Sequence, residues 1–399
     1  MNDRALCGNG VPWGAAESAS TIFATADGHC PGPPIVHSDT VALLLYCESP
    51  IKKTWSGWPL VVRSVQLSIL LPTNRHGPLA LSRIAQVCSW AGPSIEVIVR
   101  DNSGNAEKRM LLGHFRREQC NIVIADPCEP LENYSEILRL ARGEFIFCVS
   151  DDDFCFDRAI AALPGVIDQF GKDPTVAGVT GAYALETPQG TSIVNYKSVD
   201  SDDPAVRIAG YLTYQGPNML FYSVLRRSLA ERVLVFMKAM PVYLSFHDQI
   251  LCLLYLLNGK FIRLQRLFYG YDAGVWEATE TAQKRDVDFY RAAGLDPAMN
   301  KLHWFLCGFE GAVLVRNSVE FFDHSLAQRQ VIADRWFSMM FMRFKSQARL
   351  TFESRFADDA EKVRIKLLAS TGQLSFQGML TEICGLIALF SKDNAQRYH

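Results

Sequence analysis

Residues 144–153 read EFIFCVSDDD, an apolar run followed by a serine and three consecutive aspartates. A short apolar run between polar residues is typical of a strand that is buried on both faces of a sheet. Three adjacent carboxylates at the end of such a strand repel one another unless a cation or hydrogen-bond donors compensate their charge. The stretch therefore indicates a parallel α/β sheet with an acidic site at the carboxyl end of one strand.

Short apolar runs alternate with helical patterns on both sides of this stretch. Between the runs, apolar residues recur at helical spacing, as in the stripe of Tyr134, Ile137, Leu138 and Ala141. Strand–helix alternation with short links predicts an α/β fold whose mostly parallel central sheet is flanked by helices. The predicted strands cover residues 65–71, 95–100, 121–125, 144–149 and 176–183. A further helix is predicted over residues 158–170, with a break at Pro164.

The character of the sequence divides the chain into three regions. Residues 1–62 are rich in Gly, Pro and Ser and are predicted to form an irregular arm. Residues 63–300 carry the α/β pattern. Residues 301–399 are helical in pattern, with one apolar stripe starting at Phe305 and a later one over residues 383–390. We therefore expect one catalytic-sized domain between the arm and a helical C-terminal region.

Composition excludes several classes of protein. Hydrophobic residues make up 49% and charged residues 21%, which excludes a disordered chain. The net charge of -2 argues against a protein that binds nucleic acid through its phosphates. The 11 cysteines include no C-x-x-C pair, which favours reduced thiols. Because no apolar run is long enough to span a bilayer, we expect a cytoplasmic protein, with peripheral contact at the inner face of a membrane left open.

Polar residues follow several of the predicted strands. Thr73 and Arg75 follow the first strand, Asp101 follows the second, and residues 150–153 follow the fourth. Ligands of open α/β sheets bind at the carboxyl ends of the strands, so these clusters are expected to converge. Oxygen ligands at D-x-D spacing suit Mg²⁺ or Mn²⁺, with phosphate oxygens completing the shell. The alternative is an acidic turn that caps the helix after Asp157.

Three segments resemble the large inverting glycosyltransferase family 2, whose members have the Rossmann-like GT-A fold. They are residues 67–75 (LSILLPTNR), residues 96–103 (EVIVRDNS) and residues 141–147 (ARGEFIF), which lead into the triple aspartate. The first is one residue shorter than the family's Pro-Thr-x-Asn-Arg turn. The resemblance extends over residues 65 to about 265. It implies sugar transfer from a UDP-sugar or other nucleoside diphosphate sugar to a hydroxyl acceptor such as a glycan or lipid-linked saccharide, as in polysaccharide biosynthesis.

The resemblance also implies roles for single residues. Thr73 and Asp101 would contact the nucleoside, and Asp151 would lie near the ribose. Asp153, together with Asp151, would hold Mg²⁺ or Mn²⁺ against the diphosphate. Two further residues complete the expected donor site: Arg75 and Asp152.

An inverting transfer needs a general base for the acceptor hydroxyl. In the family this carboxylate lies downstream of the metal motif, at the start of a helix. Here Asp248 precedes the apolar run of residues 250–257, so it is the predicted base. An aspartate at this position is also a favoured helix N-cap. The family more often has an acidic residue where this chain has His247, and residues 268–272 lack a histidine that many relatives place after the last strand.

Two other functions fit part of this pattern. A phosphohydrolase of the haloacid dehalogenase type also places D-x-D after a buried strand. It requires Thr or Val where this chain has Cys155, and it carries the motif on its first strand. A GT-A-like domain that binds a nucleotide or a partner without turnover is the non-enzymatic alternative. Intact Asp151, Asp153 and Asp248 favour catalysis.

Overall fold

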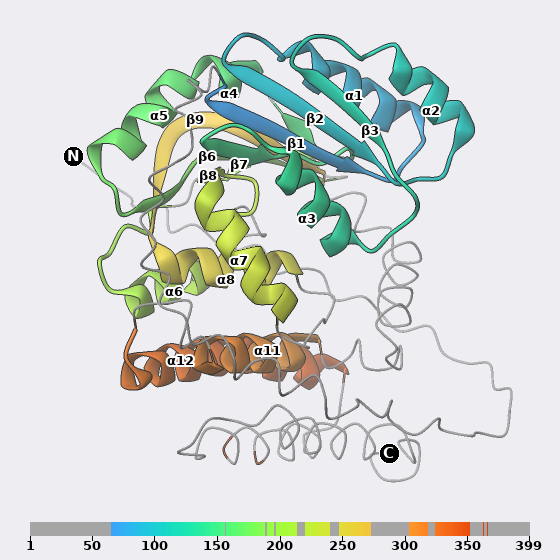
Figure 1. The fold of residues 1–399 in the computed structure, drawn as a ribbon. Helices are drawn as coiled ribbons and strands as arrows, with labels where there is room; N and C mark the ends of the chain where they lie inside the picture. Colours follow the sequence, from blue (N-terminus) through green and yellow to red (C-terminus); the bar gives the residue numbers. More distant parts are fainter. Residues whose placement is uncertain are drawn as a thin grey trace, which may run out of the picture. The chain divides into compact units, whose positions relative to one another are not determined.

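The computed structural model describes residues 65–155, 157–187, 190–194, 197–213, 220–239, 247–272, 303–317 and 324–351, with single residues 362 and 365 (Figure 1). All of them belong to one compact unit, Ser64–His399. The predicted arm over residues 1–62 and the apolar stripe over residues 383–390 lie outside the described residues.

The first four strands form the parallel part of a nine-stranded sheet. They are β1 (Leu67–Thr73), β2 (Ile95–Asp101), β3 (Cys120–Ile124) and β4 (Phe145–Cys148), in the spatial order β3-β2-β1-β4. Leu67 is in register with both Ile95 and Phe145, so the carboxyl ends of β1, β2 and β4 meet at one edge. The first four predicted strands are confirmed, each to within two residues at its ends, and the fifth, predicted over residues 176–183, begins as predicted but extends to residue 187.

Helices cover both faces of this parallel part, as Figure 1 shows. Successive side chains of a strand point to opposite faces of the sheet, so alternate residues of these strands belong to two separate hydrophobic cores, one on each face. On one face lie α1 (Pro78–Ser89), α2 (Ala106–Gly113), α4 (Asp157–Ala161) and α5 (Leu163–Lys172). On the other lies α3 (Pro130–Leu140), whose predicted stripe with Tyr134 and Ile137 is buried. The break predicted at Pro164 occurs at Ala162, between α4 and α5.

The second half of the sheet mixes directions. It contains β5 (Phe154–Cys155), β6 (Val176–Thr187), β7 (Gly190–Val194), β8 (Val224–Arg226) and β9 (Lys260–Asp272). β8 is antiparallel to both β4 and β6, whereas β9 runs parallel to β6 and pairs at its end with β5. The pairing with β5 brings the end of β9 beside the residue that follows Asp153.

Five further helices are described: α6 (Pro204–Thr213), α7 (Arg227–Ala239), α8 (His247–Asn258), α11 (His303–Asn317) and α12 (Leu326–Thr351). α8 is buried along residues 250–257, as its apolar run predicts. It shares one hydrophobic core with α11 and α12. The indole N–H of Trp336 on α12 donates to the carbonyl of Cys307 on α11 at 3.1 Å. The described C-terminal helices are therefore continuous with the core beneath the sheet.

The carboxyl end of α8 is fixed by a buried arginine. The guanidinium of Arg207 on α6 donates to the carbonyls of Leu256 at 2.8 Å and Leu257 at 3.2 Å. These carbonyls lie in the last turn of the helix, where no intrahelical N–H is left to pair with them. Arg207 thus ties α6 to the helix that carries Asp248.

Gly259 lets the chain leave α8 in close contact with the sheet. A Cβ at this position would lie 2.4 Å from the carbonyl oxygen of Thr175, a backbone atom that cannot turn aside. We expect Gly259→Ala to lower the free energy of unfolding by about 1–3 kcal/mol, measured by urea denaturation. Gly165→Ala is the matched control, because a Cβ there meets nothing within 4 Å. Equal stability of the two variants would contradict the close approach.

Candidate active site

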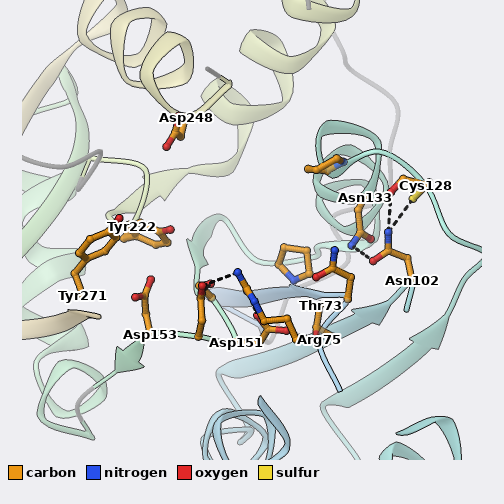
Figure 2. A pocket seen from close by; sticks show the side chains of 15 residues that line it. Thr73, Arg75, Asn102, Cys128, Asn133, Asp151, Asp153, Tyr222, Asp248 and Tyr271 are labelled. Carbon is orange, nitrogen blue, oxygen red and sulfur yellow. Dashed lines mark hydrogen bonds and ion pairs between the residues drawn. The ribbon is translucent and has the colours of Figure 1, made fainter. Parts of the chain in front are cut away.

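The predicted polar strand ends border one pocket of about 280 Å³ (Figure 2). Thr73 and Arg75 after β1 and the aspartates after β4 line one wall. Asp248, from the start of α8, lies across the pocket from them, as Figure 2 shows. Thr73 and Asp153 share this cavity, although they are far apart in sequence, because the parallel strands β1 and β4 end at the same edge of the sheet.

Asp151 is held on two sides. The hydroxyl of Thr73 donates to one carboxylate oxygen, and Nη1 of Arg75 lies 2.5 Å from the other. The second guanidinium nitrogen of Arg75 lies 2.6 Å from the carboxylate of Asp152, which also accepts a hydrogen bond from the Ser150 hydroxyl. Burial lowers the pKa of Arg75, but the charges of Asp152 and Asp151 outweigh it and leave the pKa raised. Arg75 therefore stays a cation between two carboxylates.

Asp153 has a different environment from its two neighbours. Its side chain is 5% exposed. One carboxylate oxygen accepts a hydrogen bond from the Tyr269 hydroxyl at 2.5 Å, and the other accepts one from the backbone N–H of Asp272 at 3.1 Å. Burial, together with the charge of Asp152, raises the pKa of Asp153 to about 7, although these two donors and Arg75 oppose the shift. Its charge is therefore poorly compensated.

These carboxylates fit a divalent cation. Three of them face one guanidinium, that of Arg75, so the wall keeps an excess of negative charge. Within the described ranges, no group of three or more His, Cys, Asp or Glu side chains is placed to hold a metal ion. A cation at Asp153 would therefore take most of its ligands from outside the described residues. Mg²⁺ commonly binds in this way, through one or two carboxylates, substrate phosphates and water.

Asp101 lies at the end of β2, as predicted, but it does not line the pocket among the described residues. Its carboxylate is 2.8 Å from the ammonium of Lys108, and both side chains are 1% exposed. The hydroxyl and backbone N–H of Ser103 also donate to it. Lys108 donates in turn to the Thr73 hydroxyl at 2.7 Å. Asp101 and Lys108 thus form a buried pair beneath Thr73.

Several residues that line the pocket were not among the predicted site residues. Asn102 donates from its amide to the carbonyl of Cys128 at 2.9 Å and accepts from the amide of Asn133 at 2.9 Å. These three residues lie at one end of the pocket, while Tyr222 and Tyr271 lie near Asp153 at the other (Figure 2). The sequence signals for them were the position of Asn102 two residues after the predicted strand and the aromatic character of Tyr222, which could also belong to the core.

Asp248 is the second residue of α8 and not its N-cap, because the helix already begins at His247. It is half-buried, and its carboxylate accepts a hydrogen bond from the N–H of Gln249 at 2.8 Å. A carboxylate in the first turn of a helix is favoured by the helix dipole. The side chain of His247 lies outside what the structure describes.

Comparisons with known proteins find a likeness at the level of structure. No known protein family and no curated protein matches the chain. The structure of S. aureus TarS 1-349 in complex with UDP-GlcNAc is 15% identical, with a TM-score of 0.50 over 81% of this chain and 81% of that one. The fold is that of a GT-A glycosyltransferase.

Two more structures of glycosyltransferases show weaker likeness to this GT-A chain. TarS 1-349 in complex with UDP is 13% identical, with a TM-score of 0.49 over 83% of this chain and 92% of that one. The mannosyltransferase PcManGT from Pyrobaculum calidifontis, in complex with GDP-Man and Mn2+, is 11% identical. Its TM-score is 0.40 over 89% of this chain and 94% of that one.

The predicted fold class is thus confirmed: a GT-A sheet, mostly parallel at its centre and flanked by helices. At these identities the likeness concerns the fold alone. In the part of the chain that the structure describes, no helix has the length and hydrophobicity needed to cross a membrane.

Proposed function

We propose that the protein is an inverting glycosyltransferase that moves a sugar from a nucleoside diphosphate sugar to an acceptor hydroxyl with the help of a divalent cation. One observation carries this proposal. The acidic wall formed by Asp151, Asp152 and Asp153 faces a separate carboxylate, Asp248, across a single pocket. Donor activation and acceptor deprotonation are thereby assigned to opposite walls, as an inverting displacement requires.

The donor is assigned to the wall formed by β1 and β4. Asp153 would hold Mg²⁺ or Mn²⁺, which when bound stabilises the charge that the leaving nucleoside diphosphate gains. Arg75 supplies positive charge beside the same phosphates. Asp151 would join the metal only after Arg75 leaves it, because the guanidinium and the Thr73 hydroxyl engage both of its oxygens. The UDP-GlcNAc bound by TarS supports a UDP-sugar as the first donor to test.

The acceptor is assigned to the side of the pocket below α8. Asp248 would accept the proton of the acceptor hydroxyl while that oxygen attacks the sugar from the face opposite the leaving group. Tyr222 and Tyr271 flank this space and offer aromatic surface of the kind on which sugar rings pack. Burial raises the pKa of Tyr222 well above its usual value, so its hydroxyl stays protonated. The acceptor is therefore proposed to be a saccharide.

A cytoplasmic location is part of this proposal. Cys88 on α1 and Cys120 on β3 are buried neighbours in one hydrophobic core, and both are free thiols. Neighbouring thiols are kept reduced in the cytosol, whereas secreted proteins tend to pair them.

A screen of nucleotide-sugars tests the function directly. The full chain is heated with UDP-, GDP- and other nucleotide-sugars, each with and without Mn²⁺, and the melting temperature is recorded. A donor at 100 times its Kd stabilises the folded state by about 2.7 kcal/mol, which gives a clear upward shift. We expect the shift for one nucleotide class and expect it to need Mn²⁺. No shift with any nucleotide-sugar would contradict the proposal.

Metal-supported donor binding should depend on pH near neutrality. The pKa of about 7 for Asp153 means that its carboxylate is mostly protonated at pH 6 and mostly ionised at pH 8. Only the ionised form binds a cation, so the affinity for Mn²⁺ should rise about tenfold from pH 6 to pH 8. Isothermal titration with Mn²⁺ in the presence of UDP measures this. An affinity for Mn²⁺ that does not change between pH 6 and pH 8 would show that the pKa of Asp153 lies outside this range.

A further inference from the structure

Asp153 is positioned from one strand only. Both hydrogen bonds described for its carboxylate come from β9: the Tyr269 hydroxyl donates to Oδ2 and the backbone N–H of Asp272 donates to Oδ1. By contrast, Asp151 and Asp152 are held by Arg75, Thr73 and Ser150, which are near β1 and β4. The orientation of Asp153 therefore depends on the far half of the sheet.

The backbone reinforces this connection. Asp153 is followed directly by β5, whose Phe154 and Cys155 pair antiparallel with Gly270 and Tyr269 of β9. The segment after the acidic turn is thus fixed to β9 at the same position from which the tyrosine hydroxyl reaches the carboxylate. This double attachment sets both where Asp153 lies and which way its oxygens face.

The donors from β9 are neutral. A tyrosine O–H or a backbone N–H orients a carboxylate without cancelling its charge, and each carboxylate oxygen keeps further acceptor capacity. An arginine in the same place would compete with a cation for that charge, as Arg75 does at Asp151. The Tyr269 contact therefore leaves Asp153 able to hold a divalent ion while fixing its direction.

Tyr269 is itself held firmly and away from the pocket surface. It is 1% exposed, and its ring stacks on that of Tyr222 with centroids 4.3 Å apart and an interplanar angle of 19°. Tyr222 lines the pocket, whereas Tyr269 does not among the described residues. Its direct link to the proposed metal site is the hydrogen bond that its hydroxyl donates to Asp153.

We propose that Tyr269 is a positioning residue for the metal site: its hydroxyl holds the Asp153 carboxylate in the orientation that binds the divalent cation. This inference rests on the proposed function, because it needs a metal at Asp153. Hydrogen-bond partners of metal ligands typically contribute a factor of about 10–100 to metal affinity.

The test is a titration of the full-length protein with Mn²⁺, in which electron paramagnetic resonance measures the free ion with and without UDP. Tyr269→Phe removes only the hydroxyl and keeps the ring that stacks on Tyr222. We expect its Kd for Mn²⁺ to rise at least about tenfold. Tyr255→Phe is the matched control, because it removes another buried hydroxyl, one that pairs with the hydroxyl of Tyr134. Its Kd should stay within about twofold of wild type.

Binding of UDP without metal separates positioning from loss of structure. Damage to the fold would weaken metal-free UDP binding as well, whereas a positioning role leaves it unchanged in Tyr269→Phe. Unchanged Mn²⁺ affinity in Tyr269→Phe, or equal losses in both tyrosine variants, would overturn the inference and leave the proposed function intact. If wild-type protein retains no Mn²⁺ even with UDP, the metal-dependent function is wrong and the inference fails with it.

Discussion

Asp248→Asn is expected to slow sugar transfer by about 10²–10⁴-fold, the range that a general base contributes, while the affinity for the donor stays unchanged. Asparagine keeps the size of the side chain and an oxygen that still accepts the hydrogen bond from the N–H of Gln249. The start of α8 should therefore remain folded. What is lost is the ability to take up a proton from the acceptor hydroxyl.

Steady-state kinetics with the donor found in the screen measure this effect. The loss should appear in kcat, and the donor Kd from isothermal titration should match that of wild type. Asp168→Asn is the matched control, because Asp168 lies on the exposed surface of α5 and pairs there with Lys172. Normal transfer by Asp248→Asn would rule this residue out as the base and show that another group accepts the proton.

Asp153→Asn is expected to abolish the part of donor binding that depends on metal. The amide is neutral and coordinates hard cations more weakly than a carboxylate does. Because no group of three metal-binding side chains occurs in the described part of the chain, the loss of this one carboxylate is hard to replace. We expect the affinity for Mn²⁺ with UDP to fall by about 100-fold or more.

The comparison with Asp126→Asn shows whether this loss is specific. Asp126 is exposed in the loop between β3 and α3, and it does not line the pocket. Its replacement should leave the stabilisation by Mn²⁺ and UDP intact. Without metal, Asp153→Asn should melt at or above the wild-type temperature at pH 8, because ionising a buried carboxylate whose pKa is raised costs stability above its unfolded pKa. A clear fall in that temperature would point to a structural role instead.

The parallel half of the fold was predictable because its signals are local. β4 is apolar throughout, β1 and β2 are mostly apolar, and helical stripes such as that of α3 separate the strands. The second half of the sheet, which mixes parallel and antiparallel strands, gave weaker signals. β8 has three residues, and β7 is mostly exposed, so neither has the apolar pattern of a buried strand. β8 takes its place by pairing with β4 and β6, which are distant in sequence, whereas β7 pairs with the adjoining β6.

Some residues of the candidate site were likewise predictable from the sequence, and others were not. Residues directly after a strand, such as Asp153, could be assigned to the sheet edge from position alone, and the apolar run behind Asp248 identified the helix that it begins. The orientation of the Asp101 side chain could not be predicted. It is set by a buried ion pair with Lys108, which holds the carboxylate away from the pocket. Tyr222 could be interpreted from the sequence either as a residue that stacks on a sugar or as a core residue, and only the structure places it in the pocket lining.

By itself, the sequence determined that three aspartates follow a buried parallel strand and therefore lie at the ligand-binding edge of an α/β sheet. Only the tertiary structure decided how they differ. Arg75 forms ion pairs with Asp151 and Asp152, whereas the described hydrogen bonds of Asp153 come from neutral donors on β9. Strand pairing brings Tyr269 to Asp153 across 116 positions of sequence, and burial raises the pKa of that carboxylate. Such long-range contacts depend on packing, which periodicity along the chain does not encode.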